Sequence, residues 1–233
     1  MCRDCRPERG QVKAVVVDID GTLADDSRRV DLEAVSALRR VSDSGVPVML
    51  ASGNVLPIVY SLATYMGLDG PMIAENGGIV CHRHRVWILG DPGEPRRALE
   101  HLADKMPVER IFTDRWRETE IGLVESGTDI EEVRRLLEGF DVDVQRTGWA
   151  LHVMGRGMDK FVGVQKGCEI LGLSVEETAS IGDSDNDSGM LSGCGWGVAV
   201  GNGSEVSRRA ASHAVTASNG EGVLQALEWL RLI

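Results

Sequence analysis

The sequence predicts an α/β fold with a parallel sheet and an inserted α+β segment. Short apolar runs without alternation, such as "VKAVVVD" at residues 12–18, are typical of parallel strands buried on both faces. Segments with apolar residues at helical spacing follow these runs in the first and the last part of the chain. Such alternation indicates strand–helix–strand units with helices on both faces of one sheet.

The first part of the chain, to residue 78, contains three predicted strands and two predicted helices. After the first strand, apolar residues at helical spacing run from Ala34 to Val41, and Gly45 ends that helix. The runs "VPVMLASG" and "PMIAENGG" are two further buried strands, and "VLPIVYSLATYMGL" is a helix between them. We expect a three-stranded parallel unit.

Residues 79–156 interrupt this pattern and are predicted to form an inserted α+β module. Extended or hairpin structure is expected in "IVCHRHRVWIL", and strand structure in "ERIFTDRWRETEIGLVES". Helices are expected from Arg97 to Met106 and in "DIEEVRRLLEGF". The segment "VDVQRTGWALHVMG" is expected to form two strands joined at Thr147-Gly148.

From Asp159 the first pattern resumes. Phe161, Val164, Cys168 and Leu171 lie at helical spacing, "TASIGDSD" is a short strand that ends in acids, and "WGVAVG" is another strand. A last helix has an apolar stripe around Val223 and Leu227. We therefore expect residues 11–78 and 157–233 to form one discontinuous core, with residues 1–10 as a disordered extension.

Composition and charge exclude several classes of function. The chain has 233 residues, 42% of them hydrophobic, and a formal net charge of −11. That charge argues against binding to nucleic acid or to an anionic membrane surface. No run approaches the ~20 apolar residues of a membrane span, and the N-terminus lacks the apolar stretch of a secretory signal. We expect a cytoplasmic protein.

The cysteines agree with a reducing compartment because they are odd in number and scattered. Cys2 and Cys5 form one C-x-x-C pair, but no second pair supplies the other ligands of a zinc site.

Acidic residues gather after two of the predicted strands. Asp18 and Asp20 follow the first strand, and Asp183, Asp185 and Asp187 follow "TASI". The carboxyl ends of parallel strands meet at one edge of a sheet, where ligands bind. Clustered carboxylates repel one another, so a hard divalent cation such as Mg²⁺ is expected between them. The alternative is that they are helix caps or turn residues, but two clusters at strand ends favour a metal.

Other motif assignments fail. "DSDNDSGMLSGC" begins like a calcium-binding loop, but Ser188 and Cys194 stand where that loop needs Gly and Glu. The chain has no G-x-x-x-x-G-K-[ST], and "GCGWGVAVG" does not complete G-x-G-x-x-G.

Four segments resemble, in order, the motifs of the haloacid dehalogenase superfamily of phosphohydrolases. They are "DIDGT", "LASGN", "RGMDKFVGVQKGCEILGL" and "IGDSDND". The place of the inserted module is similar to that of the Cof-type branch, whose Rossmann-like core carries a cap inserted after the third strand. Three looser segments, "SGNVLPIVYSLATYMGLDGPMIAENGGIV", "DRWRE" and "ALHVMGRGMDK", resemble the archaeal-type phosphoglycolate phosphatases.

The resemblance implies catalytic and metal-binding roles. Asp18 would be the nucleophile that forms an aspartyl-phosphate, and Asp20 would protonate the leaving group and then deprotonate water. Mg²⁺ would bind the carboxylate of Asp18, the backbone carbonyl of Asp20 and Asp183, with Asp187 as a direct or water-mediated ligand. Asp185 is not expected to be a ligand.

The resemblance also implies phosphate-binding residues, namely Ser52, Gly53, Asn54 and Lys160. Asn76 and Asn202 lie next to core strand ends and are further candidates for lining the site, although Asn in a turn needs no functional reason. Lys160 would pair with the phosphate and keep Asp18 ionised. Phe161 follows it where the family often has Gly, so Lys166-Gly167 is a competing match. Lys166 falls mid-helix on a different face, and we expect it to be a surface lysine.

The inserted module should select the substrate. Arg115, Arg117, His152 and Arg156 are candidates for binding a second anionic group, although each is as easily an exposed surface charge. The resemblance implies a Mg²⁺-dependent phosphatase that hydrolyses a small phosphorylated metabolite, with 2-phosphoglycolate, giving glycolate and phosphate, as the best candidate. A sugar-phosphate phosphatase or phosphomutase of the same fold is the alternative.

A phospho-acceptor signalling domain is the alternative from another class of protein. It also has an Asp at a strand end, but it would have no cap and no acid two residues after the acceptor, so Asp20 and the inserted module argue against it. The sequence leaves monomer and homodimer open.

Overall fold

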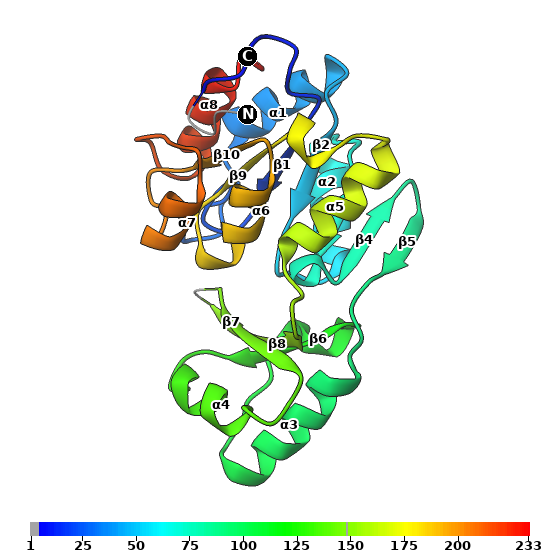
Figure 1. Ribbon diagram of the computed structural model, residues 1–233, viewed down its shortest axis with the longest axis vertical. Helices are drawn as coiled ribbons and strands as arrows, with labels where there is room; N and C mark the ends of the chain where they lie inside the picture. Colours follow the sequence, from blue (N-terminus) through cyan, green and yellow to red (C-terminus); the bar gives the residue numbers. More distant parts are fainter. Residues whose placement is uncertain (1–4, 148) are drawn as a thin grey trace.

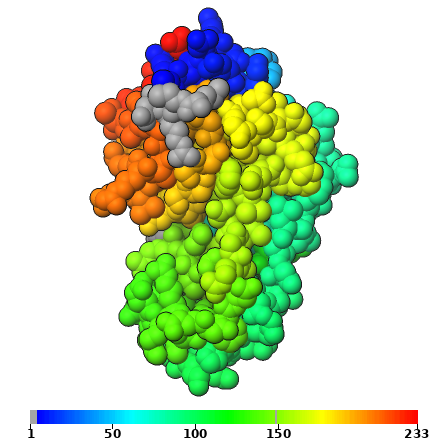
Figure 2. Space-filling view, in the orientation of Figure 1, coloured from blue at the N-terminus to red at the C-terminus, as the bar shows by residue number. Residues whose placement is uncertain are grey.

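The computed structural model describes residues 5–147 and 149–233. Within these residues the strands form two separate sheets. The larger sheet has the order β11-β10-β9-β1-β2-β3-β4-β5, and the smaller has the order β6-β8-β7. Each sheet with its helices forms one lobe of an elongated molecule, and the C-terminus lies in the lobe of the larger sheet (Figure 1). The space-filling view shows the green lobe of the smaller sheet below that lobe (Figure 2). The predicted α/β fold with an additional α+β part is confirmed.

The centre of the larger sheet is β1 (Ala14–Asp18), which pairs in parallel with β2 (Val48–Ala51) and β9 (Thr178–Gly182). Its side chains are buried on both sides of the sheet, with Val15 and Val17 in one apolar cluster and Val16 in the other. The unbroken apolar run follows from this double burial. β3 (Met72–Ala74), β10 (Trp196–Ala199) and β11 (His213–Ala214) extend the parallel part.

Helices cover both faces of the larger sheet. On one face lie α1 (Leu32–Asp43), α2 (Leu56–Met66) and α8 (Asn219–Trp229). On the other lie α5 (Lys160–Leu171) and α6 (Ser188–Gly193), with α7 (Glu205–Ala210) beside α6. Local signals set the helix ends, because Asp31 and Asp159 cap α1 and α5 through their side chains, and Gly67 ends α2 in the left-handed conformation.

A hairpin closes the far edge of the larger sheet. β4 (Ile79–His82) pairs antiparallel with β3, and β5 (Arg85–Ile88) pairs antiparallel with β4. We expected these residues in the inserted module, whereas the structure places them in the larger sheet. The hairpin pattern was correct, but alternation within a hairpin does not indicate which sheet the hairpin joins.

The smaller sheet is antiparallel and consists of β6 (Glu120–Val124), β7 (Val142–Arg146) and β8 (Ala150–Gly155). α3 (Gly93–Lys105) and α4 (Ile130–Leu136) pack on one face around Leu102, Leu123 and Val153. Its other face is turned to the larger sheet (Figure 1). The expected strand before β6 is instead mostly the 3₁₀ turn η2 (Phe112–Trp116), and Asp114 within it accepts a hydrogen bond from the amide of Gly122.

The two lobes interlock at η1 (Glu75–Gly77), directly after β3. The buried carboxylate of Glu75 accepts hydrogen bonds from the amide of Thr119, 2.8 Å away, and from its hydroxyl, 2.7 Å away. Gly77 has φ +97°, and a Cβ at this position would collide with the carbonyl oxygen of Asp159. This 3₁₀ turn therefore touches both the segment leading into β6 and the segment returning from β8.

The remaining elements are the short 3₁₀ turns η3 (Val175–Glu177) and η4 (Asp185–Asp187). Residues 1–4 of the expected N-terminal extension, Cys2 included, lie outside the described residues. Farther along that extension, Arg6 donates hydrogen bonds to the carbonyls of Trp229 and Glu228 at the end of α8. No helix in the described part of the chain is long and apolar enough to cross a membrane.

Candidate active site

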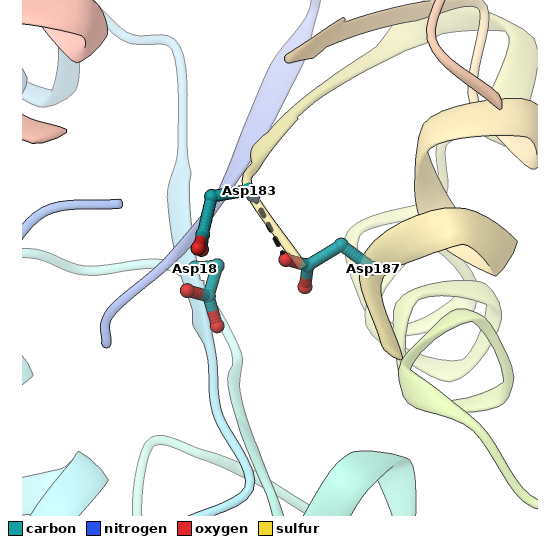
Figure 3. Close-up of side chains that lie close together, drawn as sticks. All are labelled: Asp18, Asp183 and Asp187. Carbon is teal, nitrogen blue, oxygen red and sulfur yellow. Dashed lines mark hydrogen bonds between the residues drawn. The ribbon is translucent and has the colours of Figure 1, made fainter. Parts of the chain in front are cut away.

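Three carboxylates converge at the carboxyl end of the larger sheet. Asp18 is the last residue of β1, Asp183 follows β9, and Asp187 ends η4. Each offers an oxygen within 4.8 Å of the others. Figure 3 shows the three carboxyl groups turned toward one another from two neighbouring strands and the following turn. The pairing of β1 with β9 therefore brings the two acidic clusters together.

Lys160, the first residue of α5, lies among these carboxylates. Its Nζ is 2.5 Å from Oδ1 of Asp18 and 2.7 Å from Oδ1 of Asp187, and the residue is 2% exposed. Lys166 lies elsewhere and forms an ion pair with Glu169, at 2.8 Å. The structure thus brings Lys160, and not Lys166, to Asp18.

The protonation equilibria reflect this crowding. Burial, followed by the charge of Asp187, raises the pKa of Asp18 well above its usual value and that of Asp183 to about 7. Burial lowers the pKa of Lys160, but the carboxylates of Asp18 and Asp187 outweigh it and hold that pKa above its usual value. One ammonium group does not balance three carboxylates, so the site favours a further positive charge.

The carboxylates differ in how many of their oxygens are already bonded. Oδ2 of Asp187 accepts hydrogen bonds from the amides of Asp183 and Ser184, at 3.0 and 2.9 Å, while its Oδ1 faces Lys160. Thr22 donates to Oδ1 of Asp183, at 2.8 Å. Oδ2 of Asp18 is buried and has no hydrogen-bond partner among the described residues. These oxygens are ligands that a hard cation prefers, and the triad could hold a metal ion.

The second predicted motif faces Asp20. The side-chain amide of Asn54 donates to Oδ2 of Asp20, at 2.7 Å, and Oγ of Ser52 lies 3.4 Å from the same oxygen. Ser52 Oγ also accepts the backbone N–H of Asn54, at 3.0 Å. Gly53 contributes its carbonyl oxygen, which accepts a hydrogen bond from Nη1 of Arg117, at 3.0 Å. Asn54, which we expected to bind phosphate, is thus placed to orient Asp20.

A cavity of about 500 Å³ opens beside Asp20 and Asp183 and reaches the turn between β7 and β8. The sequence-predicted residue Asn202 lines it and donates to the carbonyl of Gly21, at 2.8 Å. Asp185 also lines it and accepts a hydrogen bond from Ser204, at 2.6 Å. Other lining residues are Asp25, Asp26, Arg28, Arg146, Thr147, Trp149 and Ser184.

The four candidates for binding a second anion do not line this cavity. Arg115 stacks against Phe112 and Trp116, and exposed Arg156 pairs with Asp141. Arg117 and His152 are buried and both contact the carboxylate of Glu120, which also accepts a hydrogen bond from Asn76, at 3.0 Å. Burial raises the pKa of Glu120, but His152 and Arg117 outweigh it and hold that pKa below its usual value.

Arg117 keeps one edge without a partner. Its Nε and Nη2 are buried and have no hydrogen-bond partner within the described ranges. Because Nη1 reaches the carbonyl of Gly53, this guanidinium joins the smaller sheet to the phosphate-binding loop proposed from the sequence.

Sequence reasoning missed Thr22, Arg28 and Trp149. Thr22 stands in the quoted "DIDGT" motif, and its hydroxyl could have been assigned to the metal site from that motif. Arg28 and Trp149 carried no comparable signal, because they meet only through the placement of one lobe against the other.

Comparison with known proteins agrees with this geometry. A family model described as haloacid dehalogenase-like hydrolase matches residues 15–107 and 99–227. A phosphoglycolate phosphatase of Methanothermobacter thermautotrophicus is 36% identical over 216 residues, which are 93% of this chain and 97% of that protein. A phosphoglycolate phosphatase of Archaeoglobus fulgidus is 37% identical, covering 95% of this chain and 98% of that protein.

Solved structures show the same fold. A crystal structure of a Thermoplasma acidophilum protein aligns with a TM-score of 0.89 and 29% identity, over 95% of this chain and 99% of that one. A haloacid dehalogenase-like hydrolase from Bacteroides thetaiotaomicron aligns with a TM-score of 0.77 and 24% identity, over 95% and 99% of the two chains. Since both the family model and the relatives match nearly the whole sequence, the chain belongs to the haloacid dehalogenase-like hydrolases.

Proposed function

We propose that the chain is a Mg²⁺-dependent phosphatase that hydrolyses 2-phosphoglycolate to glycolate and phosphate. The observation that carries the chemistry is the group of Asp18, Lys160, Asp183 and Asp187 at the carboxyl end of the larger sheet. The substrate is supported by relatives named phosphoglycolate phosphatase that match nearly the whole length of this chain.

The metal would be held by Asp18 and Asp183, with the backbone carbonyl of Asp20. Asp187 belongs to the same group, but its two oxygens already serve Lys160 and the amides of the loop. We therefore assign Asp187 to positioning Lys160 and the loop, with any contact to metal made through water. When bound, Mg²⁺ neutralises charge between the attacking carboxylate and the phosphate.

Asp18 is the proposed nucleophile because only one of its oxygens is used by the protein. Lys160 holds Oδ1, and its positive charge opposes the rise that burial and Asp187 give to the pKa of Asp18. Attack on phosphorus would form an aspartyl-phosphate as the ester bond to the leaving oxygen breaks. Ser52, with its hydroxyl beside Asp20, is placed to donate a hydrogen bond to a phosphoryl oxygen.

Asp20 is the proposed acid and base. Asn54 engages Oδ2 of Asp20, which leaves Oδ1 free to give a proton to the leaving alkoxide. The same oxygen would then take a proton from the water that cleaves the aspartyl-phosphate. Two carboxylates two residues apart thus take different roles, because one is held by an ammonium group and the other by an amide.

We propose that the smaller sheet with α3 and α4 is a cap that selects the substrate and that the insertion begins after Ile88. The supporting observation is that the turn between β7 and β8 brings Thr147 and Trp149 to the cavity beside Asp20. The core between residues 11 and 88 and after residue 156 would then supply the groups for the phosphoryl chemistry.

The test is phosphate release from a panel of phosphorylated metabolites with and without Mg²⁺. We expect 2-phosphoglycolate to give the highest kcat/KM and activity to vanish with excess chelator. A sugar phosphate preferred over 2-phosphoglycolate would overturn the substrate assignment. Full activity in chelator would overturn the metal site, and a stable phosphoprotein without turnover would indicate a phospho-acceptor instead of a phosphatase.

A further inference from the structure

The cavity beside Asp20 is lined by carboxyl groups, and these groups would repel an anionic substrate. Its walls carry the carboxyl groups of Asp20, Asp25, Asp26, Asp183 and Asp185. Arg28 and Arg146 are the cationic side chains that line it within the described parts of the chain. A substrate with a second negative charge, away from the phosphate and its metal, needs one of these two arginines.

The two arginines differ in whether they are already paired. Arg146 forms an ion pair with Glu125, at 2.9 Å. The guanidinium of Arg28 forms no ion pair or side-chain hydrogen bond with the residues that the structure describes. Instead, its Cζ lies 4.7 Å from the centre of the Trp149 ring. A guanidinium stacked on an aromatic face keeps its in-plane N–H groups free, and these fit a carboxylate in a two-pronged arrangement.

The backbone holds Arg28 in this place at a cost. Oδ1 of Asp25 accepts the amides of Ser27 and Arg29, both at 2.9 Å, and the amide of Arg28 donates to the carbonyl of Asp25, at 2.8 Å. Arg28 itself has φ +58°, a left-handed conformation that is unfavourable for a residue with a side chain. Asp25 therefore stabilises a tight turn in which Arg28 keeps its left-handed backbone conformation. In this turn the guanidinium of Arg28 lies over the ring of Trp149.

The contact joins the two lobes. Arg28 comes from the loop after β1, whereas Trp149 directly precedes β8 of the smaller sheet, and both line the cavity beside Asp20. The core loop therefore supplies the guanidinium of this stacked pair, and the proposed cap supplies the aromatic ring.

We propose that Arg28, seated on Trp149, binds the carboxylate of 2-phosphoglycolate and sets the preference for a phosphoester with a second anionic group. This inference rests on the proposed function. It assigns substrate selection to a residue of the core loop and gives the cap residue Trp149 the task of holding the guanidinium in place.

The experiment compares two substrates of equal chain length, 2-phosphoglycolate and 2-hydroxyethyl phosphate, which carries an uncharged hydroxymethyl group in place of the carboxylate. Arg28→Ala should lower kcat/KM for 2-phosphoglycolate about tenfold to a hundredfold, the usual range for losing charge-assisted hydrogen bonds. For 2-hydroxyethyl phosphate it should change kcat/KM by less than about threefold. Arg29→Ala is the control. It removes the same charge at the next residue, and the side chain of Arg29 does not line the cavity.

Two further variants separate recognition from general damage. Arg28→Lys keeps the charge without the planar fork and should fall between wild type and Arg28→Ala for 2-phosphoglycolate. Trp149→Leu should raise KM for 2-phosphoglycolate more than for 2-hydroxyethyl phosphate, and Trp149→Phe should recover most of the loss. Calorimetry on Asp18→Asn protein with Mg²⁺ then measures binding of both compounds without turnover.

Several results would overturn the inference. Equal losses for both substrates in Arg28→Ala would show a role in cap closure only, and an equal loss in Arg29→Ala would show a general field effect. Selective loss in Arg146→Ala and not in Arg28→Ala would move the subsite to the other arginine. If the wild-type enzyme does not prefer 2-phosphoglycolate, the proposed function itself fails, which the wild-type measurement alone reveals.

Discussion

Asp18 and Asp20 stand two residues apart but in different surroundings, so the same substitution should affect them differently. Asp18→Asn removes the proposed nucleophile, and we expect no turnover above the blank. Asp20→Asn removes acid and base assistance, typically worth ~10²–10⁴-fold, and we expect phosphorylated protein to accumulate. Phosphate release and intact-protein mass spectrometry measure the two effects. Wild-type turnover in Asp18→Asn would contradict the assignment.

The two lysines of α5 provide a second comparison. Lys160 touches two buried carboxylates, whereas Lys166 pairs with Glu169 at the surface. Lys160→Ala should lower kcat by about 10²–10³-fold, as loss of a preorganised electrostatic contact commonly does. Lys166→Ala should leave kcat/KM unchanged and alter the free energy of unfolding by no more than ~0.5 kcal/mol. A loss of activity confined to Lys166→Ala would place the third motif at the wrong lysine.

Sequence alone predicted the residues whose positions depend on strand ends and motif order. Asp18 and Asp183 meet because β1 and β9 are neighbours in a parallel sheet. The alternation of strands and helices predicts such a sheet, with the carboxyl ends of its strands at one edge. The meeting of Arg28 with Trp149 depends instead on how one lobe rests on the other, which no local pattern encodes. For the same reason the sequence left Arg117 open between a candidate for binding a second anionic group and an exposed surface charge, whereas the structure shows it buried against Glu120.

At the scale of elements, η1 should tolerate little change. Gly77→Ala would force a side chain into φ +97° and against the carbonyl of Asp159, so we expect a loss of at least about 2 kcal/mol in the free energy of unfolding. Gly172→Ala is the matched control: it has φ +69° with nothing within 4 Å, so only the conformational cost of about 1 kcal/mol applies. Urea denaturation measures both. Equal losses would show that η1 is not tightly packed.

Glu75 in η1 gives a pH dependence. Burial, followed by the charge of Glu120, raises the pKa of Glu75 above 4.5 in the folded protein. Between 4.5 and that raised value the folded state holds a proton that the unfolded state has released, so the free energy of unfolding falls as pH rises through this window. Glu75→Gln cannot titrate and should show a smaller fall, measured by urea denaturation across pH. Glu100→Gln, on the exposed side of α3, controls for the lost charge, and an unchanged slope in Glu75→Gln would contradict the prediction.

The elements predicted well are those with a clear local pattern. α1 and α5 have apolar residues at helical spacing, and β1 is a short apolar run rich in valine. β4 and β5 were expected as extended or hairpin structure but in the inserted module. The structure pairs them with β3 at the edge of the larger sheet, and the local sequence of a hairpin does not indicate which sheet it joins. The turn η2 was taken for a strand, since Phe112, Thr113 and Trp116 are residue types that are enriched in strands.

For the whole molecule, metal binding should be visible as stability. Mg²⁺ that binds only the folded state at a hundred times its Kd adds about 2.7 kcal/mol. For a chain of this size that corresponds to a rise in Tm of about 5–10 °C. Thermal unfolding with Mg²⁺, against chelator at matched ionic strength, measures it. Asp183→Asn should lose most of the rise, and a full rise in that variant would place the metal elsewhere.

The pairing of β1 with β9 also has a consequence for folding during synthesis. β1 leaves the ribosome about 160 residues before β9, which must later add to its open edge. At ~5–20 residues per second this wait is roughly 10–30 s. During it, the emerging chain can complete the smaller sheet but carries an apolar strand with one unpaired edge, the feature that most invites association with other chains. Nascent chains that stop before residue 178 should therefore depend on chaperones until synthesis is finished.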